Sequence, residues 1–227
     1  MRSVLVVGGS KGIGRAIVSN LVERNQVISF SRQGSDLEHE HLVNHELDVT
    51  RDELPKLDRL DSLIYCPGTI NLKPFSRLSR EDYLEDFEIN VLGAVRVLKE
   101  YEKLLKGSDG SSVVLFSTVA SNMGMVFHSS VAVSKSGVEG LVRSLAAEWA
   151  PGVRVNAIAP TITDTPLASR ILRNDDIREK MKDRHPLKRI LSPSEVAELA
   201  CFLLSDAAAS MTGQVLSMDA GMLSVKV

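Results

Sequence analysis

The stretch VVGGSKGIGRAI, from Val6 to Ile17, determines how the rest of the sequence is interpreted. It joins a short apolar run to an amphipathic helical pattern and places glycines at positions 8, 12 and 14. Glycine lets a backbone turn sharply and approach a pyrophosphate closely, while the first N–H groups of a helix and its dipole favour an anion. Because the glycines follow a predicted strand and precede a predicted helix, the stretch predicts a dinucleotide-binding turn.

Around this turn, short β-branched runs alternate with helical patterns. The predicted strands are Val4–Val7, Gln26–Phe30, Leu42–Val49, Ser62–Cys66, Ser112–Phe116, Val153–Ile158 and Gln214–Ser217. The predicted helices are Ile13–Arg24, Ser79–Lys106 with a break near Asn90, Val131–Trp149, Asp175–Arg184 and Ser194–Ser205. Several strands are apolar throughout, as in a parallel sheet buried on both faces. The pattern predicts an α/β protein with a doubly wound Rossmann fold of about seven parallel strands and helices on both faces.

Two connections differ from a plain strand and helix alternation. The segment SRQGSDLEHEHL between the second and third strands contains no clear helical pattern, so we expect a shortened crossover. The segment 161–189 is long and charged, and it is either a lid over a pocket or a solvated surface helix. No repeat or linker divides the chain, so residues 1–227 are expected to form a single dinucleotide-binding domain.

Composition limits the kind of partner. With 27 Lys and Arg against 29 Asp and Glu, the net charge of −2 offers no strong field for nucleic acid or a membrane surface, so we expect neither partner. Cys66 and Cys201 lack metal spacing, as do His39, His41 and His45, so no metal site is predicted. No run is long enough for a membrane span or a signal peptide. These features favour a cytoplasmic protein with a small-molecule substrate.

The end of the second predicted strand bears on the choice of cofactor. An acidic residue there would accept a hydrogen bond from the ribose 2′-OH of NAD, but the sequence has Ser31 and Arg32, which could hold a 2′-phosphate. Lys11 in the glycine turn adds a nearby cation. NADP is therefore favoured over NAD, the alternative being that Arg32 is merely solvated. Asp48, after the third strand, could accept from the adenine amino group.

These features together resemble the short-chain dehydrogenase/reductase family, and most closely its bacterial ketoacyl reductase branch. The resemblance rests on the glycine turn, Asp48, Tyr65-Cys66-Pro67-Gly68 in place of the family's Asn-Asn-Ala-Gly, Asn90 in FEINVLGA, LFSTVAS, Lys135, VRVNAIAPTITDTPL at 153–167 and TGQVLSMDAGM at 212–222. It implies NAD(P)-dependent hydride transfer with a carbonyl or alcohol substrate. The cofactor-binding residues that it implies are Gly8, Ser10, Lys11, Gly12, Ile13, Gly14, Ser31, Arg32, Asp48, Val49, Pro67, Gly68, Lys135, Pro160, Thr163 and Thr165.

In that family a Ser, a Tyr, a Lys and an Asn share the catalytic work. The resemblance assigns Lys135 and Asn90 to two of these roles, and Thr118 takes the place of the Ser. The Tyr is expected four residues before the Lys, one helical turn away, where the sequence has Val131. An aliphatic side chain can neither donate a proton nor stabilise an oxyanion.

Three groups could supply the missing proton. His128, just before the predicted helix, titrates near neutral pH when unperturbed. Ser129 or Ser130 could reach the pocket, although one of them is expected to cap the helix. A water held by Lys135 and Asn90 is the third candidate.

Two functions remain open at this point. One is an NADP-dependent oxidoreductase with an atypical proton donor. The other is a weakly active or inactive NADP-binding protein that acts as a sensor or partner subunit. The family resemblance also implies that Ser79–Lys106 and Val131–Trp149 pair with a second copy, so we expect a homodimer or homotetramer.

Overall fold

The computed structural model describes residues 1–226 and contains one parallel sheet in the order β3-β2-β1-β4-β5-β6-β7. The strands are β1 (Arg2–Val7), β2 (Asn25–Ser31), β3 (Leu42–Glu46), β4 (Ser62–Tyr65), β5 (Ser111–Phe116), β6 (Val153–Pro160) and β7 (Val215–Met218). The chain builds β1, β2 and β3 outward, then crosses back so that β4 pairs with the other edge of β1. In such a sheet, ligands bind outside the carboxyl ends of the strands where the order reverses, here β1 and β4.

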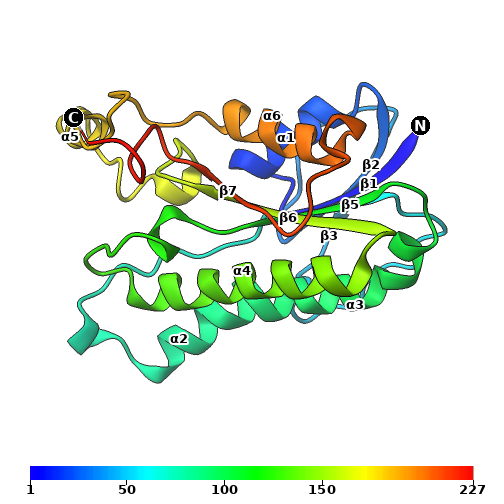
Figure 1. Cartoon of the computed structure of the whole chain (residues 1–227), viewed down its shortest axis with the longest axis horizontal. Coiled ribbons are helices and arrows are strands. Elements are labelled where there is room, and N and C mark those ends of the chain that lie inside the picture. The colour runs from blue at the N-terminus through cyan, green and yellow to red at the C-terminus, as the bar shows by residue number, and fades with distance from the viewer. Residues whose placement is uncertain (227) are drawn as a thin grey trace.

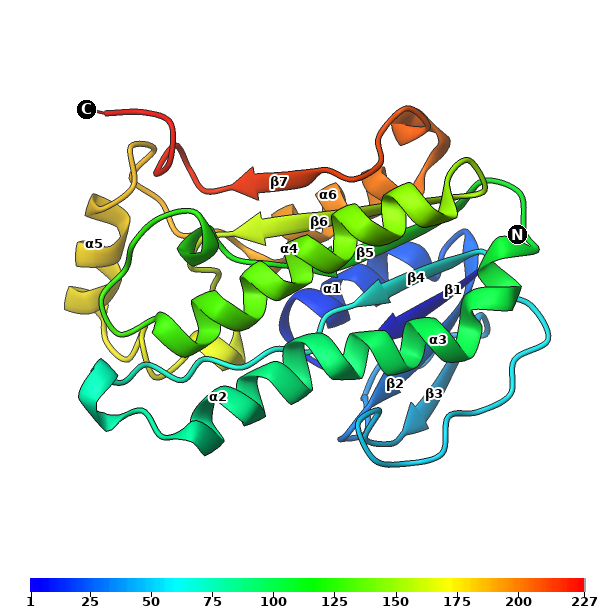
Figure 2. The same ribbon diagram turned by 60° about the horizontal axis from the view of Figure 1, so that its bottom comes forward.

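Helices cover both faces of the sheet (Figure 1). One face carries α1 (Gly12–Leu21) and α6 (Pro193–Leu204), and the other carries α2 (Arg80–Phe87), α3 (Gly93–Lys106) and α4 (Ser129–Trp149). Figure 2 shows that α5 (Asp175–Asp183) lies off the sheet, beyond the arrowheads of the strands. Short 3-10 turns occur at Phe75–Arg77, Val119–Ser121, Pro166–Ala168 and Asp206–Ala208. The predicted single-domain Rossmann fold is confirmed.

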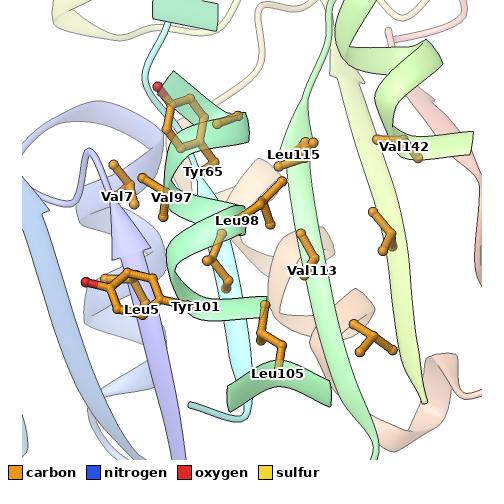
Figure 3. Packing of buried hydrophobic residues seen from close by; sticks show 14 of the residues in the cluster. Leu5, Val7, Tyr65, Val97, Leu98, Tyr101, Leu105, Val113, Leu115 and Val142 are labelled. Carbon is orange, nitrogen blue, oxygen red and sulfur yellow. The ribbon is translucent and has the colours of Figure 1, made fainter. Parts of the chain in front are cut away.

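The core explains why the strands are apolar throughout. All four residues of β4 and all six of β5 are buried, because helices cover both of their faces. Between the sheet and α3, the side chains of Tyr65, Leu98 and Tyr101 interlock in one cluster (Figure 3). The Tyr101 hydroxyl donates to Pro55 O at 2.7 Å, so its polar end is satisfied inside the protein. Burial of each such side chain contributes about 1.5–3 kcal/mol.

Three local predictions can be compared with the structure. The second crossover has no helix, as expected. The helical run does not break near Asn90 but passes through a π-helical turn at Glu88–Leu92, an irregularity that often marks a functional site. The third strand ends at Glu46 and not at Val49, because Asp48 Oδ1 accepts from Thr50 N and Thr50 Oγ1 and so forms a turn. None of the helices formed by residues 1–226 is long and apolar enough to span a membrane.

Candidate functional site

The glycine turn lies between β1 and α1. Gly8 and Gly12 have φ angles of +82° and +55°, which favour glycine, and a Cβ on Gly14 would lie 2.1 Å from Gly8 O. No side chain among the described residues caps α1, and its first turn contains no acidic residue. The first N–H groups of α1 therefore remain available to an anion. This turn, which includes Ser10, Lys11 and Ile13, fits a pyrophosphate.

Polar and charged side chains gather at the carboxyl ends of β2 and β3. Lys11 Nζ bonds to Gln33 Oε1, and Ser31 Oγ donates to Gln33 O at 2.8 Å. The exposed Arg32 guanidinium makes no hydrogen bond or ion pair with the rest of residues 1–226. Burial would raise the pKa of Asp48, but hydrogen bonds from Thr50 and the charges of Arg32 and Arg51 outweigh it and hold this pKa below its usual value. Arg32 and Asp48 therefore lie close enough to act on one ligand. Val49, next to Asp48, is buried.

The chain after β4 and the chain after β6 both approach the glycine turn. A Cβ on Gly8 would lie 3.3 Å from Cys66 Cβ and Pro67 N, and one on Gly12 would lie 3.2 Å from Thr165 Cγ2. Thr165 Oγ1 donates to Thr163 O at 3.3 Å, which fixes the segment that leaves β6 at Pro160. The structure thus brings the predicted cofactor residues of β1, β4 and β6 to one edge of the sheet.

Lys135 and Asn90 meet at Gly68. A Cβ on Gly68 would lie 3.3 Å from both Lys135 Nζ and Asn90 Oδ1, so these two atoms border one small space. Lys135 is buried on α4, and its Nζ donates to Phe116 O at 2.9 Å. Burial lowers the pKa of Lys135 to about 8, against the opposing charges of Cys66 and Asp86. An ammonium with this pKa can exchange protons near neutral pH.

The Asn90 amide is fixed in one orientation by its neighbours. Asn90 Nδ2 lies 2.8 Å from Asp86 O, 3.0 Å from Thr69 Oγ1 and 3.1 Å from Ser134 Oγ, so its two N–H groups are shared among three acceptors. A backbone carbonyl can only accept, so the nitrogen must face Asp86 and the oxygen must face Lys135. Asn90 Oδ1 is buried without a partner among the described residues. A buried acceptor beside an ammonium is a suitable place for a water or a ribose hydroxyl.

Thr118 and Ser117 have different surroundings. Ser117 is buried, and its Oγ donates to Glu139 Oε1 at 2.7 Å. Thr118 is partly exposed and accepts from Ala120 N at 3.3 Å, which leaves its hydroxyl proton free for another acceptor. Of the two hydroxyls, Thr118 is therefore the one able to donate to a substrate carbonyl.

The first turn of α4, before Lys135, contains Val131 and two serines, and the serines do not cap the helix as predicted. Val131, one turn before Lys135, is buried and presents no polar atom. The prediction that Ser129 or Ser130 caps the helix is wrong. Helix α4 begins at Ser129, and no side chain among residues 1–226 caps it. Ser129 Oγ accepts from Tyr83 Oη at 3.1 Å, and Ser130 Oγ is buried without a partner among the described residues. The helix therefore starts a residue or two earlier than its sequence pattern indicated.

His128 stands at the N-terminal boundary of α4, seven residues before Lys135. That separation is about 10.5 Å along a helix axis. Its Nδ1 lies 2.7 Å from Val126 O and must donate to it, which leaves Nε2 as the acceptor nitrogen of the neutral ring. His128 lines a pocket of about 540 Å³, together with Met123, Met125 and Met222 and with residues 183–186 and 188 of the 161–189 segment. The pocket combines apolar side chains with His128 and with charged side chains that include Asp183, Arg184 and Lys188.

Hydrogen bonds join the later part of the 161–189 segment to its first residues. His185 is buried, its Nδ1 donates to Met181 O at 2.7 Å, and its Nε2 accepts from Thr161 Oγ1 at 2.8 Å. Arg178 also holds Asp164 through two hydrogen bonds of 2.8 and 2.9 Å. Through these contacts the segment forms one wall of the pocket.

Sequence reasoning missed Thr69 and Asp86. Asp86 is fully buried, and its Oδ1 accepts from Thr69 Oγ1 and from Asn71 Nδ2. One signal was available, because Asp86 and Asn90 are four residues apart and so share a helix face. Within the described part of the chain, no group of three or more His, Cys, Asp or Glu side chains is arranged to hold a metal ion.

Known proteins are similar to this chain over nearly its whole length. Residues 7–223 match the model of a family described as enoyl-(acyl carrier protein) reductase. Two tropinone reductase homologues of Arabidopsis thaliana are 31% identical over 240 residues and 32% identical over 243 residues. Each alignment covers 96% of this chain and 89% of the relative.

Solved structures are similar over nearly the whole chain. A short chain dehydrogenase family protein from Francisella tularensis is 27% identical with a TM-score of 0.90, covering 99% of this chain and 100% of that one. Ligand-free aldohexose dehydrogenase from Thermoplasma acidophilum is 28% identical with a TM-score of 0.89, covering 100% and 95%. A variant of ElxO with NADPH bound is 25% identical with a TM-score of 0.90, covering 99% of both chains. The chain therefore belongs to the short-chain dehydrogenase/reductase family.

Proposed function

We propose that this protein is an NADP-dependent oxidoreductase that interconverts a carbonyl compound and an alcohol, with a proton donor other than a tyrosine. The observation that carries the proposal is the shared space at Gly68, bordered by Lys135 Nζ and Asn90 Oδ1. A bound nicotinamide would supply or accept the hydride. The protein's own residues must then bind the cofactor, orient the carbonyl and move one proton.

The preference for NADP is supported by the carboxyl end of β2. Arg32 is a cation without a partner among residues 1–226, and Ser31 and Lys11 lie in the same region. A guanidinium can bind a phosphate through two parallel hydrogen bonds, whereas the ribose hydroxyls of NAD would leave it unpaired. The ElxO structures with NADPH and NADP bound lend support by similarity.

The roles of the chain's side chains follow from their surroundings. Thr118 would donate its free hydroxyl proton to the substrate carbonyl oxygen, and the segment from Thr163 to Thr165 would lie along the cofactor. The Met-lined pocket of about 540 Å³ would hold the rest of the substrate. The segment 161–189 would act as the lid of this pocket.

The proton would come from Lys135, directly or through a water that it shares with Asn90. Val131 offers no donor. The pKa of Lys135, about 8, makes its ammonium acidic enough to take part at neutral pH. His128 is the competing donor that the sequence favours, but its backbone position is about two helical turns from that of Lys135, and its Nδ1 is bound to Val126 O.

A carbonyl panel tests the proposal. Purified protein should oxidise NADPH with at least one ketone or aldehyde, with a lower KM for NADPH than for NADH. Comparison of His128→Ala with Lys135→Met then identifies the donor. If Lys135 supplies the proton, Lys135→Met should lower kcat by about 10²- to 10⁴-fold, whereas His128→Ala should change kcat less than threefold. A tenfold or larger loss of kcat in His128→Ala would transfer the role to His128.

The buried, apolar Val131 favours one alternative, an NADP-binding protein that works as a sensor or partner subunit. This alternative requires tight NADPH binding in calorimetry together with no turnover across the panel. A Val131→Tyr variant that gained activity without any change in NADPH affinity would show that the binding site is intact and only the donor is missing.

We also propose that the protein assembles as a homodimer or homotetramer through α2, α3 and α4. These helices lie side by side on one face of the sheet, with no other element over them (Figure 2). Apolar side chains are exposed there at Leu84, Phe87, Leu92 and Val133. Light scattering should give a mass at least twice that of one chain. The cytoplasmic location expected from the sequence stays a prediction.

A further inference from the structure

Asp86 is a fully buried carboxyl group that the roles proposed above leave unused. Its Oδ1 accepts from Thr69 Oγ1 and, at 2.9 Å, from Asn71 Nδ2, whereas Oδ2 is buried without a partner among the described residues. Burial of a carboxyl group is costly unless the site uses or compensates it. The position of Asp86, one helical turn before Asn90 and close to Lys135, directs attention to the proton-transfer site.

A chain of hydrogen bonds runs from Asp86 toward Lys135, and every bond in it points the same way. Thr69 Oγ1 donates to Asp86 Oδ1, and Asn90 Nδ2 donates to Thr69 Oγ1 at 3.0 Å. The other end of the Asn90 amide, Oδ1, borders the same space as Lys135 Nζ. Because aligned hydrogen bonds polarise one another, negative charge on Asp86 makes Asn90 Oδ1 a stronger acceptor facing the ammonium.

The remaining groups around Lys135 do not supply this charge. Phe116 O, from β5, is a neutral acceptor. Glu139, one turn further along α4, accepts from Ser117 Oγ and pairs with Arg143 at 3.8 Å, and its charge is not among those that act on Lys135. The Cys66 thiol, after β4, is the other titratable group that acts on Lys135, and burial raises the pKa of that thiol well above its usual value. At neutral pH the thiol is therefore uncharged, which leaves the Asp86 carboxyl to favour the ammonium.

Building on the oxidoreductase function above, we propose that Asp86 is a positioning residue: through Thr69 and Asn90 it keeps Lys135 in the charged form from which the substrate oxygen takes its proton. In the reductive direction the carbonyl carbon would accept a hydride from a bound reduced nicotinamide, which would be oxidised, and the π electron pair moves to oxygen. That oxygen bonds to a proton as an N–H bond of Lys135 breaks, directly or across one water. Lys135 is left as a neutral amine and regains a proton from solvent.

Titration of Lys135 itself tests this without any substrate. In protein labelled with ¹³C at lysine Cε, the Lys135 signal is assigned by its loss in Lys135→Arg and followed against pH by NMR. Asp86→Asn, which keeps the shape of the side chain, should lower the pKa of Lys135 by roughly one pH unit, as expected when an opposite charge is removed nearby. Glu85→Gln, at the neighbouring exposed position of α2, should leave it unchanged. An unchanged pKa in folded Asp86→Asn overturns the proposal.

Thr69→Val tests the hydrogen-bond chain separately, because it breaks the link while Asp86 keeps its charge. It should also lower the pKa of Lys135, by less than Asp86→Asn does. If the pKa of Lys135 in Thr69→Val equals that in the wild type, the role of Thr69 is overturned. Thermal unfolding of both variants establishes that they are folded.

Turnover separates this proposal from the oxidoreductase function on which it rests. In Asp86→Asn, the pH at which NADPH oxidation declines should fall by the same amount as the pKa of Lys135, with NADPH affinity within threefold of wild type. Turnover with an unshifted profile overturns the role of Asp86 alone. Absence of turnover in the wild type contradicts the oxidoreductase and the proton-supplying step together, while the NMR titration still decides whether Asp86 holds Lys135 charged.

Discussion

The phosphate end of the crevice, at Gly8–Gly14, and the proton-transfer end, around Lys135, are built from different parts of the chain. At the phosphate end the backbone forms the site: two glycines adopt positive φ, a third allows close approach, and α1 begins without a capping side chain. At the proton-transfer end side chains form it, and they come from the segment after β4, the α2 region and α4.

This difference means that the two ends should fail in different ways. A backbone site depends on the space that a Cβ would occupy, so a single methyl group is enough to disrupt it. A site of buried, hydrogen-bonded side chains depends on charge and on satisfied donors and acceptors, so a substitution of equal shape can change its chemistry without changing its fold.

The largest expected effect is at Gly14. A Cβ there would lie 2.1 Å from Gly8 O, a backbone atom that cannot move aside without opening the turn. Gly14→Ala should weaken NADPH binding by more than about 100-fold, because opening the turn would lose hydrogen bonds to the pyrophosphate that are worth about 1.5–3 kcal/mol each. Fluorescence titration of NADPH measures this.

Gly140→Ala is the matched control for Gly14→Ala. Gly140 lies inside α4, and a Cβ there would meet no atom within 4 Å. It should leave NADPH affinity unchanged and stabilise the helix by about 0.5–1 kcal/mol. Equal NADPH affinity in the two variants would contradict a backbone-built phosphate site.

A smaller effect is expected at Arg32, where the phosphate end uses a side chain. Arg32→Ala should raise the Kd for NADPH by about 10- to 100-fold, since a charge-assisted hydrogen bond contributes about 1.5–3 kcal/mol. The Kd for NADH should change little. Arg24→Ala, at another exposed arginine, serves as the control. Equal losses for both cofactors in Arg32→Ala would argue against recognition of a 2′-phosphate.

The smallest effect is expected at Thr161, which lies at the start of the pocket wall. In the wild type, Thr161 Oγ1 donates to His185 Nε2. Thr161→Val removes this donor and leaves the buried nitrogen unpaired, which should lower the free energy of unfolding by about 1–3 kcal/mol. Differential scanning calorimetry should show Tm lowered by about 2–4 °C per kcal/mol. Ser169→Ala, at an exposed position of the same segment, should not change Tm. A Tm equal to wild type in Thr161→Val would mean that this contact does not hold the segment.

The same contrast explains which features the sequence could predict. The glycine turn, the strand and helix alternation and Lys135 leave local signals, because each depends on residue type at a fixed spacing. The site around Asp86 leaves almost none. Only Asp86 and Asn90 are close in sequence; Thr69 and Lys135 are far from them along the chain, and only the packing of the α2 region and α4 on the sheet brings the four together.

Helix boundaries also escaped prediction for a physical reason. Ser129 and Ser130 have the residue type of helix caps, but tertiary contacts decide their role: Ser129 accepts from Tyr83 Oη, and both serines lie inside the first turn of α4. Similarly, the turn formed by Asp48 and Thr50 ends β3 at Glu46, earlier than the strand predicted to reach Val49.

The pH dependence of carbonyl reduction tests most directly whether Lys135 supplies the proton. Burial lowers the pKa of Lys135 to about 8, so the proton-supplying ammonium is fully present below that pH and is lost as the pH rises through it. With saturating NADPH and a reducible ketone, the single-turnover rate should be constant below about pH 7 and fall about tenfold for each unit above 8, while alcohol oxidation should rise over the same range. A reduction rate that stays level from pH 7 to 10 would contradict the account.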